Sequence, residues 1–183
     1  MSKKILIVVD MQKDFIYGSL GSPEAREIVS NVVAKIKQYK NEGNMIIATQ
    51  DTHFSDYLST EEGRKLPIPH CIVNSEGWQI EDGVFDAIRG YDNLMCVNKT
   101  TFGSVAMCEK LRELIAVDEQ SEYSIEIIGL VLNICVISNA LLVKGYFPEA
   151  EISIDLNCTA ATSKDDYESA CMVLKSCQVD IHG

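Results

Sequence analysis

The chain has 183 residues, of which 46% are hydrophobic and 23% are charged, as is ordinary for a globular protein. The formal net charge of −11 disfavours a nucleic-acid or anionic-membrane partner, because no basic patch offsets the excess of acid. The apolar run before Asp10 is too short for a signal peptide, and no run is long enough to span a membrane. Seven cysteines without C-x-x-C spacing indicate reduced thiols, so we expect a cytoplasmic protein. The length suits a single domain over residues 1–183.

Short apolar segments alternate with helical patterns along the chain. The expected strands are residues 5–9, 45–49, 94–97, 125–130, 152–154 and 178–181. Helix-capping residues are expected between them at Ser22, Ser104, Asn133 and Ser163. This alternation predicts a three-layer α/β/α fold with a doubly wound, mostly parallel sheet. Right-handed crossovers then place the carboxyl end of every strand at the same edge.

A long irregular segment, at about residues 51–93, interrupts the alternation. It holds two of the three histidines, His53 and His70, and the only tryptophan, Trp78. A segment of this length without regular structure is usually functional or disordered. The histidines and the tryptophan favour an ordered excursion that carries part of a site.

Residues 125–136 predict a buried strand, a tight turn and a helix, with Asn133 as the N-cap. Cys135 then lies in the first turn of that helix. The helix dipole favours an anion there, so the thiolate is expected to form more easily than the free-thiol pKa of about 8.5 suggests. The alternative is that Cys135 is a small buried core residue.

Reactive side chains follow four of the predicted strands. Asp10 follows the first strand, Asp51 and His53 follow the second, Lys99 the third and Cys135 the fourth. Each has a simpler explanation alone, since Asp10 suits a turn and Lys99 a solvated loop. At one sheet edge, however, an acid, a lysine and a cysteine form the set that thiol acyl-transfer chemistry needs.

Three short segments carry a family resemblance. Residues 9–15 (VDMQKDF), 98–104 (NKTTFGS) and 129–136 (GLVLNICV) are the segments concerned. They resemble the D-M-Q-x-D-F opening, the lysine segment and the G-V-x-T-D-x-C-V nucleophile turn of the isochorismatase-like cysteine hydrolases, which include the nicotinamidases. They stand in the family's order and at its usual spacing. Leu132 and Asn133 depart from the usual Thr and Asp.

The resemblance implies a catalytic triad of Asp10, Lys99 and Cys135. Asp10 would take the thiol proton, the thiolate would attack an amide carbonyl, and Lys99 would hold the negative charge. The backbone N–H groups of Val131 and Cys135 would form the oxyanion hole. The family also implies a cis peptide bond between Leu130 and Val131.

A second set of residues resembles the metal site of the nicotinamidases. Asp51-x-His53 is a common tripeptide that alone indicates a solvated turn, but it is followed by Pro-Ile-Pro-His70-Cys71. An aspartate and two histidines are a usual ligand set for Zn²⁺ or a similar divalent ion, with Fe or Mn as alternatives. Glu62 is a candidate further ligand, and the family pattern treats Cys71 as structural.

The resemblance implies a nicotinamidase, which converts nicotinamide to nicotinate and ammonia. The first alternative is hydrolysis of another small amide or carbamoyl compound. A different class is a non-hydrolytic binding or thiol-redox module, in which Cys158 could approach Cys135. Phe15, Trp78 and Phe102 are candidate walls for an aromatic substrate, although each also suits an ordinary core. Family relatives often form homo-oligomers, which we expect here.

Overall fold

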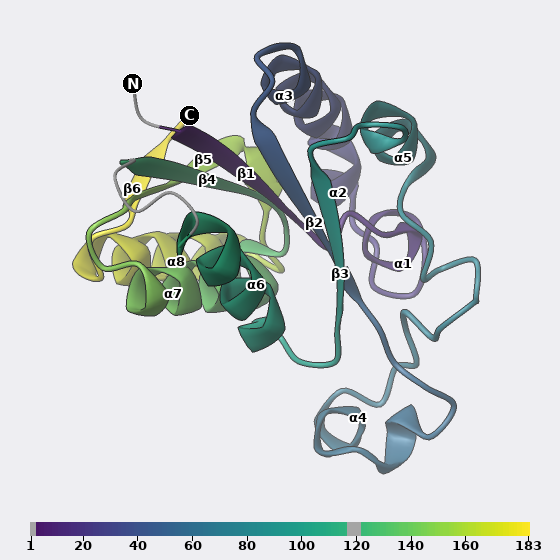
Figure 1. The fold of residues 1–183 in the computed structure, drawn as a ribbon. Coiled ribbons are helices and arrows are strands. Elements are labelled where there is room, and N and C mark those ends of the chain that lie inside the picture. Colours follow the sequence, from purple (N-terminus) through teal and green to yellow (C-terminus); the bar gives the residue numbers. More distant parts are fainter. Residues whose placement is uncertain (1–2, 117–121) are drawn as a thin grey trace.

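The computed structural model describes residues 3–116 and 122–183 (Figure 1). Within these residues the strands form one sheet in the order β3-β2-β1-β4-β5-β6, and every pairing is parallel. The strands are β1 (Lys3–Val9), β2 (Met45–Asp51), β3 (Leu94–Lys99), β4 (Tyr123–Leu130), β5 (Glu151–Ala160) and β6 (Asp180–His182). Every predicted strand is present, and the predicted parallel sheet is confirmed.

Helices cover both faces of the sheet, so the predicted three-layer α/β/α fold is also confirmed (Figure 1). One face carries α1 (Lys13–Ile16), α2 (Pro23–Glu27), α3 (Val29–Asn41) and α5 (Asp82–Ile88). The other face carries α6 (Val105–Ala116), α7 (Ile137–Tyr146) and α8 (Lys164–Ser176). Ser22, Ser104 and Ser163 each accept a backbone N–H in the first turn of a helix, as predicted.

The core has two parts, one on each face of the sheet. In β1, Ile5, Ile7 and Val9 pack into one hydrophobic cluster, whereas Leu6 and Val8 pack into the other. Successive side chains of a strand point to opposite faces, so a strand that is covered on both sides is apolar throughout. This explains why residues 5–9 of β1 show no alternation of polar and apolar residues.

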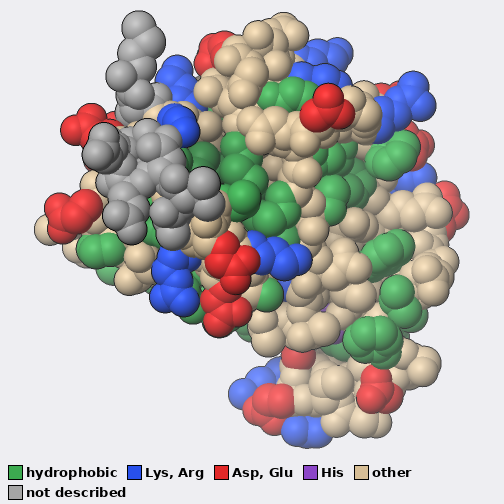
Figure 2. Space-filling view, in the orientation of Figure 1, with side chains coloured by type: hydrophobic (Ala, Val, Ile, Leu, Met, Phe, Trp, Pro, Cys, Tyr) green, Lys and Arg blue, Asp and Glu red, His purple; other side chains and the backbone are tan. Residues whose placement is uncertain are grey.

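The excursion after β2 is ordered and projects beyond the end of the sheet (Figure 1). It contains a short 3₁₀ helix (Tyr57–Ser59) and α4 (Glu61–Lys65) before the chain returns to the sheet through α5. On the face in Figure 2, Lys and Arg side chains are scattered among Asp and Glu, and histidine shows only where the excursion meets the body. In the described ranges, no helix has both the length and the apolar character that a membrane span requires.

Candidate functional site

The parallel sheet brings the candidate catalytic residues to one edge. Asp10 directly follows β1, Asp51 and Lys99 end the paired strands β2 and β3, and Cys135 lies in the turn after β4. Lys99 is central: its Nζ lies 2.7 Å from Asp10 Oδ2, 3.2 Å from Asp51 Oδ1 and 3.6 Å from Cys135 Sγ. All four side chains are buried, so a single cation contacts both carboxylates and the thiol out of contact with solvent.

Asp10 is held in an unusual backbone conformation with a φ of 48°, in the left-handed region. Thr49 on the neighbouring strand fixes it. The Thr49 hydroxyl donates to Asp10 Oδ1 at 2.7 Å and accepts the Asp10 N–H at 3.2 Å. Sequence reasoning missed Thr49, whose only signal is a polar residue within the apolar run of β2. The contact leaves Asp10 Oδ2 for Lys99.

The buried charges shift each other's protonation. Burial raises the pKa of the Asp10 carboxyl, and the Lys99 ammonium opposes this effect. Burial alone would lower the pKa of Lys99, but the Asp10 carboxylate and further nearby negative groups hold it above its ordinary value. Asp10 and Lys99 therefore form an ion pair in which the carboxylate is a stronger base than an exposed one.

The turn that carries Cys135 differs from the prediction. Leu132–Val136 forms a single π-helical turn before α7, and the Val131 carbonyl accepts the N–H groups of residues 134 and 136 at 3.1 Å each. Asn133 is not the N-cap, so this prediction is wrong. Its amide instead donates to the Thr162 hydroxyl at 2.8 Å and accepts the Thr162 N–H at 3.2 Å. The Leu130–Val131 peptide bond is cis, as the resemblance implies.

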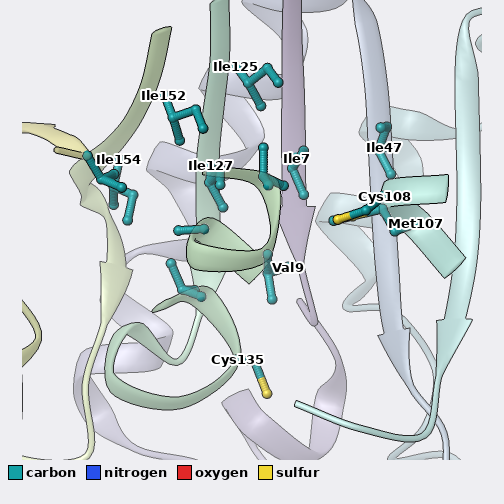
Figure 3. Close-up of a cluster of buried hydrophobic side chains, with 14 of the residues drawn as sticks. Ile7, Val9, Ile47, Met107, Cys108, Ile125, Ile127, Cys135, Ile152 and Ile154 are labelled. Carbon is teal, nitrogen blue, oxygen red and sulfur yellow. The ribbon is translucent and has the colours of Figure 1, made fainter. Parts of the chain in front are cut away.

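The protonation of Cys135 also differs from the expectation. Burial raises the thiol pKa well above its ordinary value, the Asp10 carboxylate adds to this effect and Lys99 opposes it. The expected easy thiolate is thus wrong, because burial beside a carboxylate disfavours the charged form of the thiol. Figure 3 shows Cys135 at the end of the hydrophobic cluster, with its sulfur directed away from the isoleucines. A base is needed to remove the thiol proton.

Two further buried amides organise this edge of the sheet. The Gln12 side chain donates to the Asp51 carbonyl at 2.8 Å and accepts the Asp51 N–H at 2.7 Å, which fixes the end of β2. The Asn139 side chain donates to the carbonyls of Cys135 at 2.8 Å and Phe102 at 3.1 Å. Sequence reasoning assigned no role to either. Gln12 had a signal, because it lies inside the first family-like segment, whereas Asn139 had none.

The predicted metal ligands also come together. Asp51, His53, Glu62 and His70 each offer an atom within 4.8 Å of the others. His53 Nε2 lies 3.0 Å from Asp51 Oδ2 and 3.4 Å from Glu62 Oε1. His70 Nε2 lies 3.5 Å and 3.7 Å from the same two oxygens. Glu62 comes from α4 and His70 from the loop that follows it, so the excursion completes the cluster.

The chemistry of the cluster fits a divalent metal ion. His70 Nδ1 lies 2.8 Å from the Ile68 carbonyl, which can only accept, so a neutral ring presents the lone pair of Nε2 to the cluster. Burial opposes a charge on His53, but Asp51 and Glu62 raise its pKa to about 9. The carboxylates thus attract a positive charge to this point. Two carboxylates and two imidazoles suit zinc and related divalent ions.

A cavity of about 660 Å³ opens beside the metal cluster. Its wall includes His53, Glu62 and the predicted pocket residue Phe102. Among the described residues that line it, Phe15 and Trp78 are absent. Phe15 packs behind the metal cluster with its ring centroid 5.6 Å from that of His70, and the Trp78 indole donates to the Thr52 hydroxyl at 2.9 Å.

Tyr57 was missed, since no pattern distinguishes it from an ordinary aromatic residue of the excursion. Its ring lies 4.6 Å from the His53 ring and 5.0 Å from the His70 ring, between centroids. Its hydroxyl donates to the Leu66 carbonyl at 2.9 Å. The ring of Tyr57 is therefore fixed in place and packs against both histidines.

Cys158 does not pair with Cys135. The two residues belong to hydrophobic clusters on opposite faces of the sheet. The Cys158 thiol donates to Asp155 at 3.6 Å, and burial together with that carboxylate raises its pKa to about 12. This placement opposes the alternative in which Cys158 resolves an oxidised Cys135.

Comparisons with known proteins find a matching family and related structures. A family model for the isochorismatase domain matches residues 4–182. The nicotinamidase of Saccharomyces cerevisiae is 30% identical over 112 residues, which cover 46% of this chain and 51% of that protein, so the match spans about half of that relative.

Two solved structures share the fold. The pyrazinamidase of Pyrococcus horikoshii in complex with zinc superposes with a TM-score of 0.81 at 25% identity, covering 98% of each chain. The nicotinamidase/pyrazinamidase of Bacillus subtilis superposes with a TM-score of 0.83 at 26% identity, covering 99% of this chain and 100% of that one. The family match over almost the whole chain and these structures show that this chain belongs to the isochorismatase family.

Proposed function

We propose that the chain is a metal-dependent nicotinamidase, which hydrolyses nicotinamide to nicotinate and ammonia. One observation carries the proposal: Lys99 contacts Asp10, Cys135 and Asp51 together, so a thiol–carboxylate pair and a metal-binding cluster share one buried cation. The names of the S. cerevisiae relative and of the B. subtilis structure support nicotinamide as the substrate.

Asp10 is the general base in the proposed mechanism. It takes the proton from Cys135 Sγ, and the thiolate attacks the carbonyl carbon of the amide. The raised pKa of Asp10 favours this transfer, because general-base efficiency rises with the basicity of the carboxylate. Lys99 stays charged and offsets the negative charge that moves between the carboxylate and the sulfur.

The reaction then proceeds in two stages, acylation of the thiol and hydrolysis of the thioester. The proton on Asp10 moves to the amide nitrogen, the C–N bond breaks, and ammonia leaves an acyl group on Sγ as a thioester. Asp10 next takes a proton from a water molecule whose oxygen attacks the thioester carbonyl. Breaking the C–S bond releases the carboxylic acid product, and the proton returns from Asp10 to Cys135.

We assign the oxyanion hole to the backbone N–H groups of Val131 and Cys135. Support comes from the turn between them, which is held by the two hydrogen bonds to the Val131 carbonyl and by Asn139 on the Cys135 carbonyl. Preorganised donors of this kind each lower the barrier by roughly 2.7–4 kcal/mol.

Asp51, His53, Glu62 and His70 would hold the metal, which we propose to be zinc, with iron or manganese as alternatives. The zinc in the P. horikoshii complex supports this choice. When bound, the ion supplies a Lewis acid for the ring nitrogen of the substrate. Phe102 contributes an apolar wall to the adjoining cavity.

Three broader properties belong to the same proposal. The family match over residues 4–182 supports a single hydrolase domain over residues 1–183, and the names of the relatives support a small-molecule substrate. All seven cysteines are free thiols, which fits the reducing cytoplasm. The family resemblance points to a homo-oligomer, which light scattering on the purified protein would test.

Ammonia release from nicotinamide tests the proposal directly. We expect turnover that falls when a chelator removes the metal and returns when zinc is added, because the metal cluster adjoins the reactive thiol. Turnover unaffected by chelation would overturn the role of the metal. No turnover by metal-loaded protein would overturn nicotinamide as the substrate and favour another small amide or carbamoyl compound.

Glu62→Gln is expected to weaken zinc binding by at least about tenfold. Substitution of a residue that only bonds to a metal ligand already lowers metal affinity by about 10–100-fold. The substitution removes one of the two carboxylates that face His53 and His70. Competition with a chromogenic chelator measures the affinity. Glu61→Gln is the matched control, since Glu61 is exposed and pairs with Arg64 instead. Equal affinity in both variants would remove Glu62 from the ligand set.

A further inference from the structure

We propose that Asp14 is a positioning residue for the metal site, because its carboxylate fixes the loop that carries His70. The inference rests on the proposed metal site and adds a residue that is not one of its ligands. Asp14 lies in α1, on the segment that also carries Asp10 and Gln12. The same short stretch of chain would thus organise both the reactive thiol and the metal ligands.

The Asp14 carboxylate is bound by backbone N–H groups. Its Oδ2 accepts the Cys71 N–H at 2.7 Å, and its Oδ1 accepts the Ser19 N–H at 3.4 Å. The Asp14 N–H in turn donates to the Gly77 carbonyl at 3.0 Å. Asp14 therefore fastens α1 to the excursion at two points, one on the residue next to His70 and one six residues further along.

Cys71 connects this contact to both histidines. It directly follows His70, and its carbonyl accepts the His53 N–H at 2.9 Å. Its φ of 45° lies in the left-handed region, which residues other than glycine rarely adopt. This conformation turns the N–H of Cys71 to Asp14 and its carbonyl to His53. A charge-assisted hydrogen bond to the N–H stabilises the arrangement.

The ring contacts of His70 do not replace this restraint. Its Nδ1 bonds to Ile68, a neighbour on the same loop, so that bond orients the ring but moves with the loop. The link from Cys71 to Asp14 instead joins residues 57 positions apart and ties the loop to the sheet edge. Partners that bond directly to a metal ligand typically contribute 10–100-fold to metal affinity, and we expect an effect on this scale from Asp14, which holds the backbone next to a ligand.

The fit around the carboxylate offers a second, independent variant. A β-carbon at Gly77 would overlap both carboxylate oxygens of Asp14. Gly77→Ala is therefore expected to displace the carboxylate without removing its charge. Asp14→Ala removes the acceptor altogether, so the two variants reach the same contact by different chemistry.

Zinc affinity, measured by competition with a chromogenic chelator, tests the inference. We expect Asp14→Ala and Gly77→Ala to bind zinc about 10–100-fold more weakly than the unmodified protein. Asp82→Ala is the matched control and should bind normally. Its side chain is 84% exposed and pairs with Lys13, the neighbour of Asp14, so it removes the same charge nearby without touching the loop.

The outcomes separate the inference from the proposed function. An unmodified protein that binds no zinc would overturn the metal site itself. Normal zinc binding by both the unmodified protein and Asp14→Ala would overturn the inference alone. Unfolding curves measured in the presence of chelator show which variants fold. If Asp14→Ala does not fold, the zinc affinity of Gly77→Ala decides whether the inference holds. Excess zinc should also restore turnover to a folded variant, because Asp14 contacts none of the reacting groups.

Discussion

Replacing Cys135 with alanine is expected to lower the turnover of nicotinamide by roughly 10⁴–10⁶-fold, the scale on which members of a hydrolytic triad act. Without Sγ no thioester forms, and neither Asp10 nor Lys99 offers a nucleophile in its place. Zinc content should stay unchanged, because the substitution touches no residue of the metal cluster. Ammonia release and the bound zinc, measured on the same preparation, check both expectations.

Cys108→Ala is the matched control for this prediction. Cys108 is fully buried in the same hydrophobic cluster as Cys135, but it lies among the core side chains rather than at the sheet edge (Figure 3). The same change there should leave turnover intact and reduce stability by roughly 0.5–1.5 kcal/mol, as expected for a small truncation in a core. Substantial turnover in Cys135→Ala would contradict the thiol mechanism.

The sheet could be predicted because its physics is local. A strand covered on both faces is largely apolar, as residues 5–9 of β1 and 127–130 of β4 show in their sequences. Parallel pairing then follows from the alternation with helices, and it places Asp10, Lys99 and Cys135 at one edge. The strand order β3-β2-β1-β4, which was not predicted, then brings the three residues into contact.

The protonation of Cys135 could not be predicted, because it depends on contacts between distant segments. The sequence places the thiol in a first helical turn, which favours the thiolate. The fold buries the thiol beside Asp10, which lies on another strand, and this raises the thiol pKa. Asn133 shows the same limit: its partner, Thr162, lies 29 residues away and replaces the local cap.

The positions of the three candidate aromatic residues could not be predicted for a related reason. Phe15, Trp78 and Phe102 look alike in sequence, since each is an aromatic residue near a reactive group. In the fold only Phe102 lines the cavity. It is 44% exposed there, whereas Phe15 is 9% exposed behind His70. The exposure of each side chain depends on how the whole excursion folds, and the sequence of the excursion has no periodic pattern that would predict it.

Replacing Lys99 with methionine is expected to lower the free energy of unfolding by about 3–5 kcal/mol and to abolish turnover. Methionine fills a similar volume but leaves Asp10 and Asp51 buried without the ammonium that lies 2.7 Å and 3.2 Å from them. Urea unfolding in the presence of chelator measures the stability, and ammonia release measures the activity.

Lys35→Met separates the two effects. Lys35 also bridges two largely buried carboxylates, at 3.0 Å from Glu126 and 2.9 Å from Asp155, but this cluster lies away from the candidate site. Its loss should cost stability and leave turnover unchanged. Normal turnover in Lys99→Met would show that the cation has only a structural role.

The deficit of Lys99→Met should also grow with pH. Burial raises the pKa of Asp10 while Lys99 opposes the rise, so without Lys99 the pKa in the folded state moves further up. A carboxyl raised above its unfolded value of about 3.9 stabilises the fold while protonated, and this contribution is lost as the pH rises through the folded pKa. The variant should therefore lie nearer to the unmodified protein at about pH 5 than at about pH 8. Unfolding curves with the same deficit at both pH values would show that Asp10 is not the group left uncompensated.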